Sequence, residues 1–236
     1  MLPDNVQRWT IEQFVNRLEA DPGFAFARFG DGAFFCLQGA QGVNCDGAAY
    51  GLLQATELTL ALRDTTITHG ISGVAYERAE AQAWLDEHNI RPEWWDADVL
   101  NRASDEGNLW PFVAWLNQQR VVLVGPEHVR KVRGFFYQAH VPTHPTAAFD
   151  ELDFLEHATS MAILGAVANV VLLSAGTFAS PPLVSRLHRR YPRVRFLDVG
   201  SLWDPYCGVF SRSGHKRLGI EGYRRLRQVN LEGRTA

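Results

Sequence analysis

The sequence predicts an α/β fold built on a single doubly wound, mostly parallel sheet of the Rossmann-like kind. Short apolar runs that end in Gly or Ser indicate strands, and helical patterns separate them. Strands that alternate with helices of this length are typical of βαβ units and a parallel sheet. The chain has 236 residues, 46% of them hydrophobic and 21% charged, so one large hydrophobic core is available.

The N-terminal half is the less regular part of the pattern. In order, it predicts a helix over residues 11–20, a strand over 24–28, a helix over 48–63, a strand over 66–70, and helices over 76–88 and 108–118. Five of the seven tryptophans lie between Trp84 and Trp115. We therefore expect a Trp-rich helical insertion at about 76–118, with its aromatic rings mostly in the core. The alternative is that one or two of them line a sugar or base pocket.

The C-terminal half alternates regularly. Its expected elements are a strand over 120–125, helices over 127–138 and 150–167, a strand over 169–174, a helix over 181–191 and a strand over 194–200. The first two strands are apolar on both faces, which is typical of a strand buried on both sides. The sequence shows no repeat and no domain boundary, so we predict a single domain over residues 1–236.

Several classes of protein are disfavoured by what the sequence lacks. Three cysteines without a C-x-x-C exclude a disulfide framework and an ordinary zinc knuckle. The phosphate motifs of dinucleotide oxidoreductases and P-loop NTPases are missing, as are H-E-x-x-H and G-x-S-x-G. The longest apolar stretch, 161–176, is interrupted by Asn169 and Ser174 and is too short for a membrane span. The first residues do not form a secretion signal, so the expected location is the cytosol.

The charge is unevenly placed along the chain. The formal net charge is −3, but the segment from 183 to 236 has 12 Lys and Arg against 4 Asp and Glu, a balance of +8. This basic C-terminal segment favours an anionic partner, either nucleic acid or a phosphorylated glycan or lipid. The alternative is a solvated basic helix that balances an acidic body.

Small and polar residues follow each predicted strand. Arg28-Phe29-Gly30-Asp31-Gly32 ends the first strand, Ser174-Ala175-Gly176-Thr177 follows the strand over 169–174, and Asp198-Val199-Gly200-Ser201 ends the last one. Gly125-Pro126-Glu127-His128 follows the strand over 120–125, where Glu127 and His128 are expected to begin a helix, a position at which the helix dipole favours an acidic residue. In a parallel sheet these turns meet at one edge, where helix N-termini present free N–H groups to anions. The set suits a phosphate-bearing ligand with a ribose or sugar attached.

The same residues resemble a known family. Phe26-Ala27-Arg28-Phe29-Gly30-Asp31-Gly32 is similar to the R-F-G-D-G-E signature of the GT-D-fold glycosyltransferases, a bacterial and phage group that uses a nucleotide-sugar donor. The resemblance continues through 122–127 and 172–176 to Leu197-Asp198-Val199-Gly200-Ser201 and Asp204-Pro205-Tyr206, from about residue 24 to residue 212. It implies a glycosyltransferase with a GT-D-type sheet and a nucleoside diphosphate sugar as donor.

The resemblance also implies a metal site that this sequence only half retains. Family members carry a D-x-E pair that holds a divalent cation on the donor diphosphate, but here Asp31-Gly32 is followed by Ala33. Alanine cannot ligate Mn²⁺ or Mg²⁺. Either another carboxylate completes the site with Asp31, with Asp204, Asp198 and Asp46 as candidates, or Arg28 and helix N–H groups neutralise the diphosphate without metal.

Each candidate residue has a role and an alternative. The expected donor contacts are Arg28, Phe29, Gly30, Gly32, Ser174, Gly176, Thr177, Gly200 and Ser201; the catalytic carboxylates are Asp31, Asp198 and Asp204; and the acceptor contacts are Arg224, Arg225 and Arg227. The alternative for the first motif is a tight turn in which Asp31 bonds its own backbone and pairs with Arg28. For Asp198 and Asp204 it is capping and loop hydrogen bonds, and for Ser174-Ala175-Gly176-Thr177 an ordinary strand-to-helix turn.

The function predicted from the sequence is transfer of a hexose from a nucleoside diphosphate sugar, expected to be a UDP-sugar, to an acceptor hydroxyl. A second hypothesis within the enzyme class makes modified DNA bases the acceptor, because of the basic C-terminal segment. A third is a non-catalytic nucleotide-sugar-binding module, because Glu is replaced by Ala33.

Overall fold

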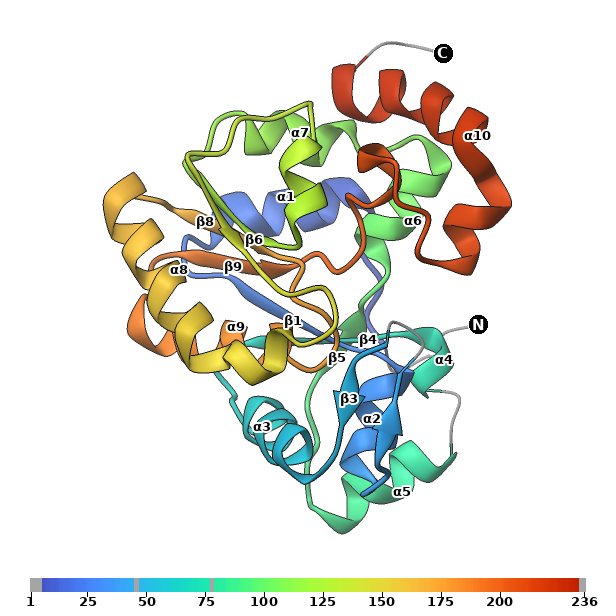
Figure 1. Cartoon of the computed structure of the whole chain (residues 1–236), viewed down its shortest axis with the longest axis vertical. Helices are drawn as coiled ribbons and strands as arrows, with labels where there is room; N and C mark the ends of the chain where they lie inside the picture. The colour runs from blue at the N-terminus through green and yellow to red at the C-terminus, as the bar shows by residue number, and fades with distance from the viewer. Residues whose placement is uncertain (1–5, 45–46, 77–78, 234–236) are drawn as a thin grey trace.

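One parallel sheet of seven strands organises the chain (Figure 1). The computed structural model describes residues 6–44, 47–76 and 79–233. Within them the strand order is β5-β4-β1-β9-β8-β6-β7, and every pairing in this sheet is parallel. The strands are β1 (Ala25–Phe29), β4 (Thr68–Ile71), β5 (Trp94–Asp96), β6 (Val121–Gly125), β7 (Ala139–Pro142), β8 (Val170–Leu173) and β9 (Arg195–Asp198), and an antiparallel hairpin, β2 (Gly42–Val43) with β3 (Ala49–Tyr50), stands apart. The predicted doubly wound α/β fold is confirmed.

Helices cover both faces of the sheet. The first face is covered by α2 (Asp31–Leu37), α3 (Leu52–Leu62), α4 (Gly73–Tyr76), α5 (Ala79–Glu87), η2 (Ala148–Glu151), α8 (Leu152–Ala166) and α9 (Ser180–Arg190). The second is covered by α1 (Ile11–Ala20), α6 (Val99–Glu106), α7 (Trp110–Leu116), η1 (Glu127–Lys131), η3 (Pro205–Cys207) and α10 (Ser213–Glu232). The sheet therefore lies between two helical layers, as a parallel sheet requires.

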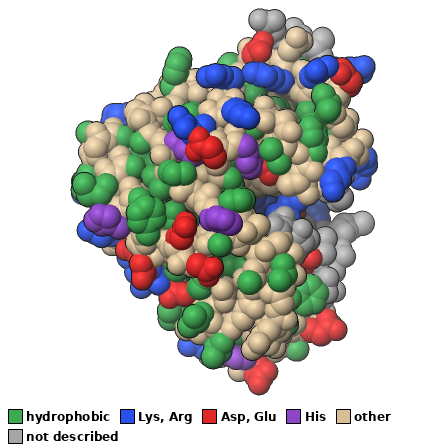
Figure 2. All heavy atoms as spheres, viewed as in Figure 1, with side chains coloured by type: hydrophobic (Ala, Val, Ile, Leu, Met, Phe, Trp, Pro, Cys, Tyr) green, Lys and Arg blue, Asp and Glu red, His purple; other side chains and the backbone are tan. Residues whose placement is uncertain are grey.

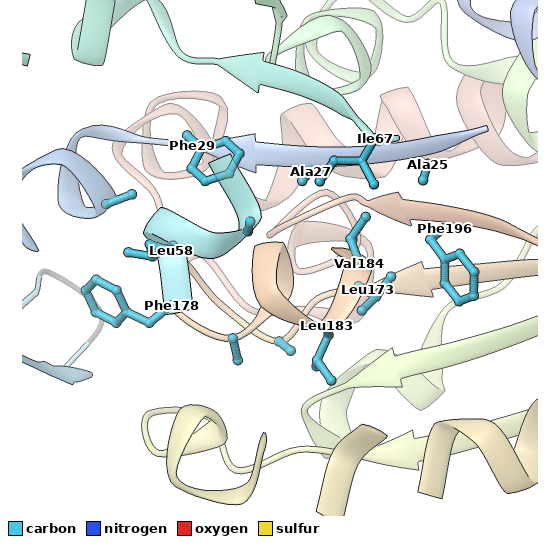
Figure 3. Close-up of a cluster of buried hydrophobic side chains, with 14 of the residues drawn as sticks. Ala25, Ala27, Phe29, Leu58, Ile67, Leu173, Phe178, Leu183, Val184 and Phe196 are labelled. Carbon is cyan, nitrogen blue, oxygen red and sulfur yellow. The ribbon is translucent and has the colours of Figure 1, made fainter. Parts of the chain in front are cut away.

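Alternate residues of each central strand supply the two cores. In β8, Val171 and Leu173 pack into the cluster on the first face, while Val170 and Leu172 pack into the cluster on the second. Figure 3 shows the first cluster, in which Phe29 of β1 lies near Leu58 of α3 and Phe178. The prediction that the strands over 120–125 and 169–174 are buried on both faces is confirmed. Burial of these side chains is the main force holding the strand ends in place.

Local sequence explains where the first helix begins. Thr10 caps α1 by accepting a hydrogen bond from the Gln13 N–H at 3.3 Å, and the Gln13 side chain accepts one from the Thr10 N–H at 2.9 Å. This reciprocal pair satisfies two of the free donors of the helix N-terminus. The predicted bounds, 11–20, are those observed.

Two predicted helices are wrong in extent. The helix expected over 127–138 is only a short 3-10 turn that ends at Lys131, because the chain becomes extended at Val132 and Gly134 adopts φ +126° where it packs against Leu231. The helix expected over 48–63 begins at Leu52, because Ala49 and Tyr50 pair with β2 instead.

The Trp-rich segment is not helical throughout. Trp94 and Trp95 belong to β5, which pairs with β4 and forms an edge of the main sheet. Trp94 and Trp115 are buried, and Trp84, Trp95 and Trp110 are half-buried against the two cores. The interpretation of these aromatic rings as core residues is confirmed.

The C-terminal helix α10 packs on the second face of the sheet. Of the four apolar residues expected to fix it there, Tyr223 is buried and Leu218 and Leu226 are half-buried, but Ile220 is 58% exposed. The helix is kinked at Gly219, whose φ is +65°. The kink shifts the phase of the apolar face, which is why Ile220 points outward. Among the described residues, no helix is both long and apolar enough to cross a membrane.

Candidate functional site

The chain continues to opposite faces of the sheet after β1 and β9, so we expect a crevice at the carboxyl edge between them. The chain leaves β1 into α2, which packs on the first face, whereas Val199 and Leu202 after β9 pack on the second face. Neighbouring strands whose continuations diverge in this way leave space between them, and such a point is the usual ligand site of an open parallel sheet. The space-filling view shows a hollow below α10 with Lys or Arg side chains inside it (Figure 2).

Arg28 lies at the centre of this crevice. Its Nη2 donates a hydrogen bond to Asp98 Oδ1 at 3.1 Å, and its side chain is 17% exposed. Its Nε is buried and has no hydrogen-bond partner within the described part of the chain. A buried guanidinium donor without a partner is uncommon in folded proteins, so this atom marks a place for a ligand acceptor. The tight-turn alternative expected Arg28 to pair with Asp31, but its partner is Asp98 instead.

Asp198 ties the ends of β1 and β9 together. Its Oδ2 accepts a hydrogen bond from the Arg28 backbone N–H at 3.2 Å, and its Oδ1 accepts one from the Gly200 N–H at 3.0 Å. The carboxyl is buried, which raises its pKa to about 6, although the nearby Arg28 charge and these hydrogen bonds oppose the rise. The structure places Asp198 beneath the crevice, where it positions Arg28.

The turn after β1 meets the turn after β8. Asp31 is exposed at the start of α2, and its Oδ1 accepts a hydrogen bond from the Gly32 N–H at 2.9 Å. A Cβ on Gly32 would lie 3.6 Å from the Thr177 methyl group, so the two turns are in contact. Asp31 is therefore an exposed carboxylate at the carboxyl edge, and its own-backbone hydrogen bond matches that part of the tight-turn alternative.

The residues after β8 add a second unpartnered polar atom to the edge. Ser174 is buried and its Oγ has no hydrogen-bond partner among the described residues. Gly176 has φ +83°, which leads the chain into α9 with the Ala175 N–H bonded to Ser180 Oγ at 3.1 Å. The turn is thus capped by Ser180, and the hydroxyl of Ser174 is left without a partner among the described residues.

The residues after β9 continue towards His128, which the sequence analysis placed after the strand over 120–125 as the start of a helix. Ser201 Oγ accepts a hydrogen bond from Arg212 Nε at 3.4 Å. Asp204 is buried, with Ser211 Oγ donating to its Oδ2 at 2.7 Å and His128 Nε2 lying 2.8 Å from its Oδ1. Asp204 therefore does not face a ligand with a free oxygen. His128 follows the turn after β6 as expected, but its pairing with Asp204 was not predicted.

Asp98, the partner of Arg28, is a residue that sequence reasoning missed. It is the N-cap residue of α6, two residues beyond β5, and it holds the Arg28 guanidinium. The three-residue strand Trp94–Asp96 was not predicted, so the residues that follow it were not recognised as part of the carboxyl edge.

The expected metal ligands do not come together. Among the described residues, no three His, Cys, Asp or Glu side chains form a group that could hold a metal ion. Ala33 is fully buried in the core of the first face, and both oxygens of Asp198 and of Asp204 are engaged. Asp46 lies outside the described residues. The carboxylates left at the crevice are Asp31 and Asp98, and Asp98 is paired with the Arg28 guanidinium, so the donor set does not fit a resident Mn²⁺ or Mg²⁺.

The basic C-terminal segment is divided between the two faces of the sheet. On the first face, Arg186 of α9 pairs with Glu57, Asp153 and Glu156 at 2.7 to 3.3 Å. These pairs match the alternative in which C-terminal arginines balance the acidic body. On the second face, Arg224 and Arg225 are exposed on α10 and Arg227 is half-buried. Figure 2 shows basic side chains gathered over this upper part of the molecule.

A cavity of about 490 Å³ opens at the opposite, amino edge of the sheet. Its walls include Arg17, Arg63, Thr66 and Trp95. The C-terminal ends of α1 and α3 lie at this edge, with Asp21 and Arg63 as their C-cap residues. Helix C-termini carry partial negative charge and disfavour an anionic ligand, so the cavity is a poorer candidate for a diphosphate than the crevice.

The fold defines the chain as an open, parallel α/β protein whose candidate site lies at its topological switch point. A solved structure with the same fold is a selenomethionine-substituted domain of unknown function 1792, with a TM-score of 0.65 over 86% of this chain and 80% of that one. The two sequences are 14% identical. No family model and no curated protein match the chain.

Proposed function

We propose that the protein is a glycosyltransferase that transfers a hexose from a nucleoside diphosphate sugar, such as a UDP-sugar, to an acceptor hydroxyl. The observation that supports the proposal is the contact of Arg28 with Asp198 and the turn at Gly200, which brings together motifs 170 residues apart in the chain. These are the segments whose sequence resembles the GT-D-fold glycosyltransferases. The shared fold with domain 1792 agrees with the architecture that this resemblance implies.

The chemistry assigned to the crevice begins with the leaving group. Transfer breaks the bond between the anomeric carbon and the diphosphate, so negative charge develops on the diphosphate oxygens. The Arg28 guanidinium, with its unpartnered Nε, donates hydrogen bonds to these oxygens. The hydroxyl of Ser174 and the backbone N–H groups of the turn at Gly176 and Thr177 supply neutral donors at the same edge.

Asp31 is assigned to the transferred sugar. It is the exposed carboxylate of the three that the sequence analysis singled out, and an ionised carboxylate accepts hydrogen bonds from sugar hydroxyls. Asp198 holds the Arg28 backbone and the Gly200 turn rather than the ligand. In this proposal Asp31 binds the sugar and Asp198 positions Arg28.

Calorimetric titration with UDP and UDP-glucose tests the proposal. We expect the wild-type protein to bind both compounds. The variant Arg28→Lys should bind them at least about tenfold more weakly, because lysine is a point charge without the planar fork of guanidinium donors. Arg63→Lys, at the exposed amino edge of the sheet, is the matched control and should bind as the wild type does. Failure to bind any nucleoside diphosphate sugar would overturn the proposal.

A non-catalytic nucleotide-sugar-binding module is the alternative favoured by the buried Ala33 in place of Glu. Release of UDP from UDP-glucose without an acceptor separates the two functions. An enzyme hydrolyses the donor slowly with water as acceptor, whereas a binding module releases no UDP above the rate in buffer. The hypothesis that modified DNA is the acceptor is supported by the exposed arginines of α10.

A further inference from the structure

We propose that His128 is the catalytic base of the transfer, positioned by Asp204. The inference rests on the proposed glycosyl transfer and assigns the one role in it that the residues of the crevice leave open. It replaces the expectation that Asp204 itself takes the proton from the acceptor.

The hydrogen bonds around Asp204 fix the orientation of the imidazole. Ser211 Oγ donates to Asp204 Oδ2 at 2.7 Å, and His128 Nε2 lies 2.8 Å from Oδ1. With both oxygens occupied and only 11% of its side chain exposed, Asp204 cannot reach an acceptor. Its carboxylate favours the tautomer with the proton on Nε2, which leaves the Nδ1 lone pair free to accept a proton.

The imidazole of His128 is more exposed to solvent than the carboxylate of Asp204. The His128 side chain is 24% exposed, and within the described part of the chain its Nδ1 makes no hydrogen bond. A histidine whose only role was to hold η1 against η3 through Asp204 would need neither this exposure nor an Nδ1 without a hydrogen bond. The pair therefore resembles the base-and-orienter arrangement used for proton abstraction.

The position of His128 in the sheet suits an acceptor next to the donor. It follows β6, and β8 lies between β6 and β9, so the end of β6 is two strand spacings, about 10 Å, from the end of β9. The turns are linked by contact, because a Cβ on Gly125 would lie 2.9 Å from the Ser174 Cβ. The Arg28 guanidinium lies over the Gly200 turn after β9, so a diphosphate bound there and an acceptor at His128 would leave room for one sugar ring between them.

The proposed step balances in atoms and charge. Neutral His128 Nδ1 takes the proton of the acceptor hydroxyl, and the oxygen forms a bond to the anomeric carbon of the donor. The bond from that carbon to the diphosphate oxygen breaks, and the electron pair leaves with the nucleoside diphosphate. The imidazolium, stabilised by Asp204, then releases its proton to solvent. In donor hydrolysis, water takes the place of the acceptor.

The test uses the full chain, UDP-glucose as donor and water as acceptor, with UDP release as the signal. His128→Gln keeps a polar side chain beside Asp204 and should lower kcat by about 10²- to 10⁴-fold. The dissociation constant for UDP, measured by calorimetry, should stay within about twofold of the wild-type value. His157→Ala, an exposed histidine on α8, is the control and should leave both quantities unchanged.

Chemical rescue separates a base from a structural residue. His128→Ala should lose turnover and regain part of it when imidazole is added, whereas imidazole should not stimulate the wild type. Turnover by His128→Gln within about threefold of the wild type, or a loss in His128→Ala without rescue, overturns the assignment of His128 alone. Absence of turnover in the wild type with every UDP-sugar tested overturns the proposed function as well.

Discussion

A Cβ atom on Gly200 would lie 2.3 Å from Nη1 of Arg28. Gly200 also has φ +52°, a backbone conformation that residues with side chains rarely adopt. The turn after β9 therefore needs glycine at position 200, because the Arg28 guanidinium occupies the space of a side chain. Two residues at opposite ends of the sequence form one structural unit, and Asp198 fixes the backbone of both.

The first prediction follows from this unit. Gly200→Ala should displace the Arg28 side chain and weaken UDP binding by about tenfold or more, which corresponds to about 1.4 kcal/mol. The left-handed backbone adds a loss of stability of about 1 to 2 kcal/mol. Calorimetry and thermal unfolding measure the two effects separately.

Gly39→Ala is the matched control for backbone strain. Gly39 has φ +85° and nothing within 4 Å of its Cβ position, so it should lose similar stability without any change in UDP affinity. Equal affinity in the Gly200 and Gly39 variants would show that Arg28 does not contact the nucleotide.

The relationship between Arg28 and Gly200 was only partly predictable from sequence. Apolar runs revealed β1, β6, β8 and β9 because these strands are buried on both faces, and parallel strands place their carboxyl ends at one edge. The sequence pattern did not reveal β5, because three residues, Trp-Trp-Asp, are too few to show a strand periodicity. Asp98, which follows this strand and pairs with Arg28, was therefore not predicted either. The pairing of His128 with Asp204 depends on how two 3-10 turns pack, which no local pattern encodes.

The second prediction concerns Asp31. Asp31→Asn should leave the Tm within about 1 to 2 °C of the wild-type value, because the side chain is exposed and its hydrogen bond is to the next residue. Turnover of UDP-glucose should be abolished, since the amide cannot replace the ionised carboxylate at the sugar. The affinity for UDP, which has no sugar to contact Asp31, should stay the same. Near-normal turnover would remove Asp31 from the mechanism.

The third prediction is a pH dependence of stability. Burial raises the pKa of Asp198 to about 6, above the ordinary value of 3.8. The folded protein therefore binds this proton more tightly than the unfolded chain does. The contribution of Asp198 to the free energy of unfolding should be greatest below about pH 4, should fall as the pH rises towards 6, and should be constant above that range.

Denaturant titrations of the wild type and Asp198→Asn between pH 4 and 7 measure this effect. Subtracting the free energy of unfolding of the variant from that of the wild type cancels the other titrating groups. The difference should decrease with rising pH. A difference that is flat or that increases would mean that the folded-state pKa of Asp198 is not raised.

The fourth prediction concerns metal removal. Because the second carboxylate of the crevice, Asp98, is already paired with Arg28, Mn²⁺ titrated into the protein alone should give no binding heat. The affinity for UDP should be equal within about twofold in EDTA and in Mn²⁺. A tenfold gain with Mn²⁺ would show that a cation joins Asp31 to the diphosphate.

The last prediction tests the arginines of α10 against a nucleic acid acceptor. Arg224 pairs with Glu221 at 2.5 Å, both side chains being exposed, while Arg225 is exposed and Arg227 half-buried. If duplex DNA binds here, log Kd should change with log salt by roughly 0.9 for each phosphate neutralised. Arg225→Gln should weaken binding more than Arg224→Gln, because Arg224 must first give up its partner. Arg190→Gln, on α9 at the other face of the sheet, is the control and should bind DNA as the wild type does. Failure of both duplex and single-stranded DNA to bind at low salt would exclude nucleic acid and leave a glycan or lipid-linked acceptor.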